Sequence, residues 1–223
     1  MDHIKHIFYI NLSTRPDRKA HIEAQLKQVG FTTYERFNAV KVADGRVGCA
    51  LSHMKCLELA KERGYPDVFI CEDDTTFLQP DLLKTQLKAF FAEHHQQNKP
   101  WDVLLLAGNN VPPYIKMSEA YVRVSHCQTT TCYLVNGPYI DTLLHHIKEG
   151  TRQLMQQPSQ HLLYAIDRYW LELQRRDLWF LITPLTVVQR EDYSDIEGHR
   201  TNYAPLMLDL DKTELLKRLR ANK

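Results

Sequence analysis

Short runs of large apolar and β-branched residues recur along this chain, and segments with helical spacing separate them. Turn-forming or polar residues bound the runs, as is typical of buried strands, and the runs cover residues 6–10, 68–71, 103–106, 130–135, 178–182 and 185–188. The segments between them predict helices at about 15–29, 49–63, 81–95, 138–146 and 159–176. This alternation predicts an α/β fold: a Rossmann-type, mostly parallel central sheet with helices on both faces.

The loop at residues 11–18 follows the first predicted strand and opens the first predicted helix. Thr14 and Asp17 have the spacing of a capping box, which predicts a helix start at this point. Arg15 and Arg18 stand in the same loop, so guanidinium groups and free backbone N–H groups could bind a nucleotide or its phosphates. The alternative is an ordinary capped helix start with two solvated arginines.

Composition favours one domain and excludes partners that bind by charge alone. A chain of 223 residues with 43% hydrophobic content can bury one core, so we expect a single domain over residues 1–223 with a short polar tail and a final helix from about 197. The 28 Lys and Arg nearly cancel the 27 Asp and Glu, which argues against nucleic acid. Any phosphate must therefore be recognised by particular side chains or backbone groups and not by the overall charge of the protein.

The five cysteines are scattered through segments predicted as core, which does not resemble a disulfide framework. With no apolar leader and no membrane-length window, the sequence predicts a cytoplasmic protein. A basic helix near the C-terminus, around residues 215–220, suggests at most peripheral membrane contact. Its cations are explained as well by the helix dipole.

Three successive carboxylates, Glu72-Asp73-Asp74, directly follow the apolar run at residues 68–71. Ligands of open α/β sheets bind beyond the carboxyl ends of strands, and clustered carboxylates suit Mg²⁺ or Mn²⁺ bridging to a diphosphate. If the chain stays extended, Glu72 and Asp74 point together and Asp73 points away. The alternative is a solvated acidic strand end.

Two further groups of side chains have the composition of functional sites. Cys49, His53 and Cys56 share one helical face, but we reject a zinc site because no fourth ligand accompanies them. We expect a hydrogen-bonded His53 instead. Asp167 stands in a helix that is otherwise typical of core and is a candidate general base; the alternative is a surface acid paired with Arg168 or a residue one turn away.

Several motifs, taken in order, resemble glycosyltransferase family 25, which includes lipopolysaccharide sugar transferases and collagen hydroxylysine galactosyltransferases. They are Tyr9-Ile10-Asn11-Leu12, Arg15-Pro16-Asp17-Arg18, Gly48-Cys49-Ala50-Leu51-Ser52-His53, Glu72-Asp73-Asp74, Thr130-Thr131-Cys132-Tyr133, Gln189 and Ser194-Asp195-Ile196. The resemblance implies a GT-A-like fold, a nucleotide-sugar donor that is usually a UDP-sugar, and inversion at the anomeric carbon.

The resemblance also implies roles for single residues. Glu72 and Asp74 match the DXD-like metal site for Mn²⁺ or Mg²⁺, His199 loosely matches a C-terminal metal ligand, and Asp167 looks like the acid beside the acceptor. Residues that match positions for binding the nucleotide or donor sugar are Asn11, Leu12, Arg15, Arg18, Ser52, His53, Asp73, Gln189, Ser194 and Asp195. A second acid beside Asp167, common in collagen-modifying members, is missing, which disfavours a collagen acceptor.

The resulting hypothesis is an inverting transfer to a hydroxyl of a glycan, a lipid-linked saccharide or a protein, with the first two preferred. A divalent ion at Glu72 and Asp74 would neutralise the leaving diphosphate, and Asp167 would take the hydroxyl proton. Two rivals are a nucleotidyltransferase, which usually carries a glycine-rich loop that is missing here, and a catalytically inactive nucleotide-sugar-binding scaffold. The donor sugar, the linkage and the oligomeric state stay open.

Overall fold

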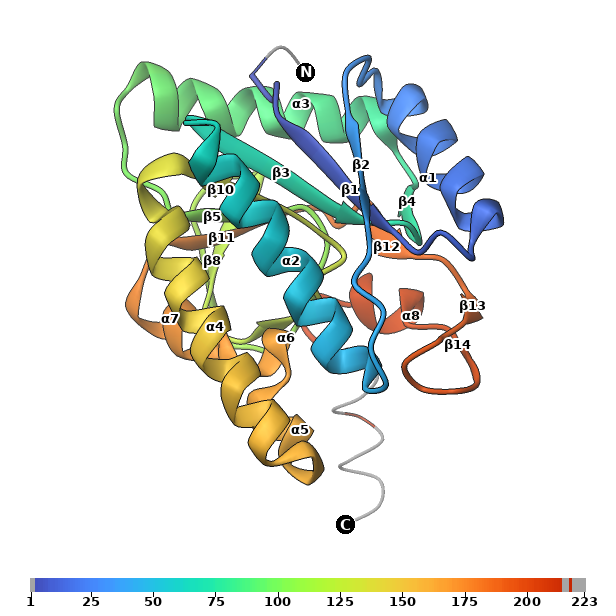
Figure 1. Cartoon of the computed structure of the whole chain (residues 1–223). Coiled ribbons are helices and arrows are strands. Elements are labelled where there is room, and N and C mark those ends of the chain that lie inside the picture. The colour runs from blue at the N-terminus through green and yellow to red at the C-terminus, as the bar shows by residue number, and fades with distance from the viewer. Residues whose placement is uncertain (1–2, 214–216, 218–223) are drawn as a thin grey trace.

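A central sheet organises the molecule, and most of its strands run in one direction (Figure 1). The computed structural model describes residues 3–213 and 217. In sheet order the strands are β2 (Glu35–Asn38), β1 (Ile7–Asn11), β3 (Asp67–Glu72), β10 (Cys132–Asn136), β5 (Val103–Leu105), β11 (Trp179–Ile182), β8 (Tyr121–Val124) and β7 (Tyr114–Lys116). Only β10 and β8 oppose the other six strands. The predicted α/β class with a mostly parallel sheet is confirmed.

Helices cover both faces of this sheet (Figure 1). One face carries α1 (Pro16–Val29) and α3 (Pro80–Phe91), which continues into the π-helical turn η1 (Ala92–Gln96). The other face carries α2 (Gly45–Glu62), α4 (Ile140–Gln156) after the 3₁₀ turn η2 (Gly137–Tyr139), and a broken segment made of η3 (Pro158–Gln160), α5 (His161–Tyr164), α6 (Ile166–Tyr169) and α7 (Leu171–Arg176).

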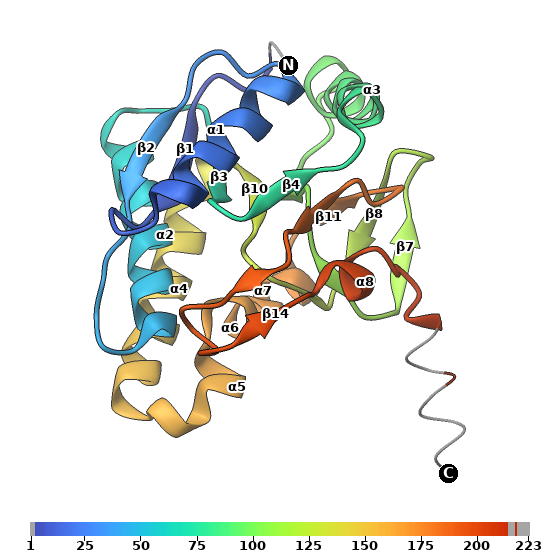
Figure 2. The same ribbon diagram turned by 90° about the vertical axis from the view of Figure 1, so that its right-hand side faces the viewer.

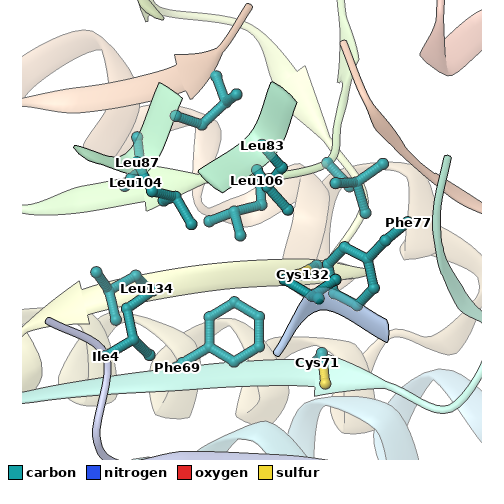
Figure 3. Packing of buried hydrophobic residues seen from close by; sticks show 14 of the residues in the cluster. Ile4, Phe69, Cys71, Phe77, Leu83, Leu87, Leu104, Leu106, Cys132 and Leu134 are labelled. Atoms are coloured by element: carbon teal, nitrogen blue, oxygen red, sulfur yellow. The ribbon is translucent and has the colours of Figure 1, made fainter. Parts of the chain in front are cut away.

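The alternation of side chains along β3 explains why the sheet has two cores. Phe69 and Cys71 pack on the side of α1 and α3, while Val68 and Ile70 pack on the side of α2 and α4. All four are fully buried. Figure 3 shows the first core, where Phe69, Cys71 and residues of β10 lie opposite Leu83 of α3. A strand apolar on both faces reads as a continuous run, which is why the sequence predicts it well.

Several predicted elements differ from the structure in their extent. The run at 185–188 does not pair with the strand before it, because β12 (Val187–Gln189) leaves the sheet and pairs with β4 (Thr75–Phe77). The predicted helix at 159–176 is interrupted at Ala165, whose extended backbone (ψ 145°) turns the chain so that Ile166 and Trp170 enter the core. The capping box at Thr14 is wrong: the N-cap residue of α1 is Arg15, and no side chain caps it.

The C-terminal part of the described chain folds back beside the end of β1 and β3 (Figure 2). A hairpin of β13 (Asp192–Tyr193) and β14 (Arg200–Thr201) is followed by the short helix α8 (Ala204–Met207), and β6 (Asn109–Asn110) pairs with β9 (Cys127–Gln128) nearby. The predicted polar tail from about 197 is therefore partly structured. The predicted basic helix around 215–220 lies outside the described residues except for Lys217, and the single domain stays a prediction.

Candidate active site

A cavity of about 400 Å³ opens where β1 and β3 end, within the size range of small-molecule sites. Five segments line it: the loop after β1, residues 39–43 after β2, the start of α2, the turn after β3, and the segment from Gln189 through the hairpin of β13 and β14 to Tyr203. Residues predicted from the sequence that line the cavity are Leu12, Arg15, Arg18, Ser52, His53, Glu72, Asp73, Asp74, Gln189, Ser194 and Asp195. The fold thus gathers most of the predicted site into one place.

The three carboxylates do not alternate as an extended strand would place them. Residues 73 and 74 form a turn between β3 and β4, so Asp73 and Asp74 both face Arg18, whose Nη1 lies 3.1 and 3.3 Å from one oxygen of each. The other oxygen of Asp74, Oδ1, is buried and has no hydrogen-bond partner among residues 3–213. Burial, and then the charge of Glu72, raises the pKa of Asp74 to about 8. A bound cation would give the unpaired oxygen a partner and would offset the cost of burying the charge of Asp74 beside Glu72.

Glu72 is held by four donors from different parts of the chain. Its Oε1 lies 2.8 Å from Thr130 Oγ1, 3.2 Å from His53 Nε2 and 3.6 Å from Cys49 Sγ, and its Oε2 lies 3.4 Å from Gln189 Nε2. Burial alone would raise the pKa of this carboxyl, but the bonds from His53, Thr130 and Cys49 lower it below its ordinary value. Glu72 is therefore ionised and fixed in place.

His53 joins this carboxylate to the interior of the protein. Its Nδ1 lies 2.8 Å from the hydroxyl of Tyr133, which is fully buried on β10. Because an ionised carboxylate can only accept, the hydrogen bond to Glu72 requires a proton on His53 Nε2. Burial raises the pKa of Tyr133 well above its ordinary value, which keeps the proton on this hydroxyl. The expected hydrogen-bonded His53 agrees with this arrangement.

The start of α2 brings a loop of the chain against the cavity. Ser52 Oγ donates to the carbonyl of Gly48 at 2.7 Å and accepts from the backbone N–H of Val40 at 2.9 Å. A Cβ on Gly48 would lie 2.6 Å from the carbonyl oxygen of Val40, so only glycine permits this close approach. The small-residue motif at the start of α2 thus positions the loop at residues 40–44, which lines the cavity.

Asn11 has a different position from the one that its motif suggests. It is buried and does not line the cavity; its Nδ2 donates to Asp73 Oδ2 at 2.7 Å, and its Oδ1 accepts from Arg36 Nε at 2.9 Å. The side-chain amide of Asn11 therefore orients the Asp73 carboxylate. Leu12, the next residue, does reach the cavity.

Arg15 and Arg18 join the loop after β1 to the C-terminal hairpin. Arg15 binds Asp195 at 2.9 Å and Asp192 at 3.0 Å, and Arg18 binds Asp192 at 3.2 Å and the carbonyl of Tyr193 at 2.9 Å. Both guanidinium groups are mostly shielded from solvent, with 17% and 11% of their side-chain surface exposed. Asp192 was missed by sequence reasoning, because no motif marks a residue 174 positions from its partner.

Asp167 and His199 lie outside the cavity lining. Asp167 Oδ2 accepts from the backbone N–H of Thr129 at 3.1 Å, so the carboxylate points inward rather than along a helix surface. Burial, and to a smaller extent the charge of Glu72, raises the pKa of Asp167. His199 is exposed in the hairpin, its Nδ1 bonds with the carbonyl of Glu197 at 2.9 Å, and it is not part of any group of possible metal ligands among the described residues.

The sequence matches the profile of glycosyltransferase family 25, described as an LPS biosynthesis protein, over residues 40–168, which is more than half of the chain. The chain belongs to glycosyltransferase family 25. The protein is therefore a glycosyltransferase, and the matched region of this family 25 enzyme contains α2, the three carboxylates, the strand with Tyr133 and Asp167. The loop after β1 and the hairpin residues lie beyond the match, so their roles in donor binding stay predictions. A comparison with curated proteins gives no match.

Solved structures with a similar arrangement share little sequence with this enzyme. A glycosyltransferase involved in glycosylation of the major capsid of PBCV-1 has 10% identity and a TM-score of 0.40, covering 81% of this chain and 92% of that one. A mutant of Drosophila β1,4-galactosyltransferase 7, in complex with manganese, UDP-Gal and xylobiose, has 14% identity and a TM-score of 0.35, covering 63% and 52%. Apo UDP-glucose pyrophosphorylase has 10% identity and a TM-score of 0.48, covering 96% and 82%. At such TM-scores none of them adds to the argument on function.

Within the described residues, no helix is both long enough and apolar enough to cross a membrane.

Proposed function

We propose that this family 25 enzyme is an inverting, divalent-metal-dependent glycosyltransferase that uses a nucleotide-diphosphate sugar, most simply a UDP-sugar. Its acceptor would be a hydroxyl of a glycan or a lipid-linked saccharide. The observation that carries the proposal is the buried Oδ1 of Asp74, which has no partner in the described part of the chain and lies beside Asp73 and two arginines in one cavity. Anionic oxygens and guanidinium groups together suit a cation and a diphosphate.

The residues at the turn after β3 fit a hard divalent cation. Asp74 offers an oxygen without a partner among the described residues, and Asp73 lies beside it against the same arginine, Arg18. Glu72 is close enough for its charge to raise the pKa of Asp74. Mn²⁺ and Mg²⁺ prefer such ligands and keep positions for phosphate oxygens. When bound, the ion would supply positive charge where the diphosphate leaves.

The other residues of the cavity divide into those that hold the donor and those that arrange the carboxylates. Arg18 balances Asp73 and Asp74 in the metal-free protein, so it stands where phosphates would bind once a cation takes over that role. The loop at residues 40–44, fixed by Ser52, forms the wall that would bind the nucleoside. Asn11 keeps the Asp73 carboxylate in one orientation.

Inverting transfer needs a base for the acceptor hydroxyl on the far side of the sugar from the leaving group. Asp167 stands apart from the Asp73 and Asp74 turn, on the side of Thr129 and Thr130, and burial raises its pKa. A carboxylate with a raised pKa is a stronger proton acceptor once ionised. We propose it as the base.

The first test is thermal stabilisation by nucleotide and metal. UDP with Mn²⁺, at about a hundred times its dissociation constant, should raise the melting temperature by about 5–10 °C, because a ligand that binds only the folded state stabilises it. With chelator present, UDP should raise it much less. GDP and CMP serve as controls for the base. An equal rise with and without chelator contradicts the metal site.

The second test separates the two arginines. Arg18→Ala should raise the donor KM about tenfold or more with a smaller change in kcat, because the guanidinium would lose charge-assisted bonds to phosphate. Arg15→Ala should have a weaker effect on donor KM, since the Arg15 guanidinium is already engaged by Asp17, Asp192 and Asp195. Lys84→Ala, on the surface of α3, is the control. If donor kinetics are unchanged in both variants, the arginines do not bind the donor, and they only join the loop after β1 to the hairpin.

A further inference from the structure

A second group of possible metal ligands lies at the other side of Glu72. Cys49 Sγ, His53 Nε2 and a carboxylate oxygen of Glu72 all lie within 4.8 Å of one another. Cys49 and His53 are one turn apart on α2, and Glu72 ends β3, so the group joins a helix to the sheet that it covers. Asp73 and Asp74 face Arg18 instead and are not members of this group.

Two of the three distances between these ligand atoms match the edges of a tetrahedron around zinc. With Zn–S of about 2.3 Å and Zn–N and Zn–O of about 2.0 Å, tetrahedral geometry separates sulfur from oxygen by about 3.5 Å and nitrogen from oxygen by about 3.3 Å. In the structure, Cys49 Sγ and His53 Nε2 lie 3.6 and 3.2 Å from Glu72 Oε1. The third pair, Cys49 Sγ and His53 Nε2, lies within 4.8 Å.

The groups around the three ligands are those that support a metal site. Ligating histidines donate the N–H of their other ring nitrogen to a fixed partner. An ion at His53 Nε2 would displace the proton shared with Glu72, and the ring proton would then lie on Nδ1, which is 2.8 Å from the buried Tyr133 hydroxyl and would donate to it. Thr130 Oγ1 lies 2.8 Å from Glu72 Oε1 and 3.8 Å from Cys49 Sγ, where it orients both. Cys49, His53 and Glu72 also line the cavity, which provides an entry path and a free fourth position.

Ligand chemistry distinguishes this position from the turn after β3. A thiolate and an imidazole select borderline-soft ions such as Zn²⁺ or Co²⁺, whereas carboxylates alone select Mg²⁺ or Mn²⁺. On binding, the Cys49 thiol would release its proton, and the resulting thiolate and the Glu72 carboxylate would together balance the charge of a divalent ion, which lowers the cost of burying it. We propose that Cys49, His53 and Glu72 bind a zinc-type cation at a position separate from Asp73 and Asp74.

This site differs from the zinc site considered and rejected from the sequence. Cys56 shares the helical face of Cys49 and His53 by spacing, but it is fully buried in the core between α2 and the sheet and is not part of the group. The third ligand comes from Glu72, far along the chain. Helical spacing alone could not identify it.

Cobalt provides the test, because a Co²⁺ ion bound by a thiolate absorbs in the near ultraviolet, and a tetrahedral one absorbs in the visible. Metal-free wild type titrated with Co²⁺ should develop both absorptions at a single ion per chain, and Zn²⁺ should displace them. Cys49→Ser should abolish the near-ultraviolet band, with folding checked by circular dichroism. Cys56→Ser, the matched control on the same helix, should keep it.

A second arm separates this proposal from the proposed function. Asp74→Asn should keep the cobalt band, since Asp74 is not a ligand here; loss of the band would place the ion at the turn after β3 and overturn the proposal. X-ray absorption of the zinc-loaded wild type should show one sulfur at about 2.3 Å, and zinc without sulfur would also overturn it. Nucleotide stabilisation by Mn²⁺ can fail or succeed independently of either result.

Discussion

Asp74→Asn is expected to lower sugar transfer by about 10²–10³-fold, the range seen when one group that stabilises charge in the transition state is removed. The amide nearly preserves the volume of the carboxyl but removes the negative charge that would hold the divalent ion. Transfer should be measured with saturating donor at a fixed Mn²⁺ concentration. Asp81→Asn, a fully exposed carboxylate on α3, is the control and should transfer at the wild-type rate.

The same substitution should not destabilise the metal-free protein. The folded-state pKa of Asp74, about 8, lies above the ordinary value of an aspartate, so the folded protein binds this proton more tightly than the unfolded chain does. Stability from this group is therefore present at low pH and is lost as pH rises from about 4 to about 8.

The asparagine of Asp74→Asn does not ionise, so the variant should not lose stability as pH rises. At pH 8 the free energy of unfolding of this variant should therefore exceed that of the metal-free wild type by on the order of a few kcal/mol. At pH 5 the difference should be much smaller. Urea unfolding with chelator measures both values. Low activity together with a less stable fold at pH 8 would mean that Asp74 supports the structure, and the metal assignment would then be wrong.

The sequence could predict the parts of the site that depend on strand order. A continuous apolar run such as residues 68–71 identifies a strand buried on both faces, and the polar residues after it must lie at the sheet edge where ligands bind. Glu72, Asp73 and Asp74 were placed correctly for that reason. Their individual orientations were not, because the turn at residues 73–74 depends on β4 pairing with β12, more than a hundred residues away.

Contacts between distant segments account for the other misses. Asn11 looks like a ligand-binding residue by its motif, yet its amide is used by Asp73 and Arg36, which no local pattern specifies. Asp192 has no sequence signal at all and still binds both arginines. Cys49 has a helical spacing that points to Cys56, whereas the fold places it beside Glu72. Spacing along one helix identifies a shared face but not what lies opposite it.

Asp167→Asn is expected to lower transfer by about 10²–10⁴-fold while leaving nucleotide and metal binding nearly intact, because a general base acts only on the acceptor hydroxyl. In the structure, this substitution removes the proton acceptor but can keep the hydrogen bond to Thr129. The carboxylate accepts a bond from the backbone N–H of Thr129, and the carbonyl oxygen of an asparagine can accept the same bond. The backbone around Thr129, which has a positive φ of 77°, should therefore stay in place.

Asp167→Ala provides the comparison that separates catalysis from structure. It removes the base and also leaves the Thr129 N–H without a partner, which should cost about 1–3 kcal/mol of stability. If Asp167 is the base, the asparagine and alanine variants should be similarly slow, but only the alanine variant should melt lower. If Asp167 only holds Thr129, the asparagine variant should transfer within a few-fold of wild type with saturating donor and metal. The next candidates for the base would then be Asp73 and Asp195, whose carboxylates line the cavity.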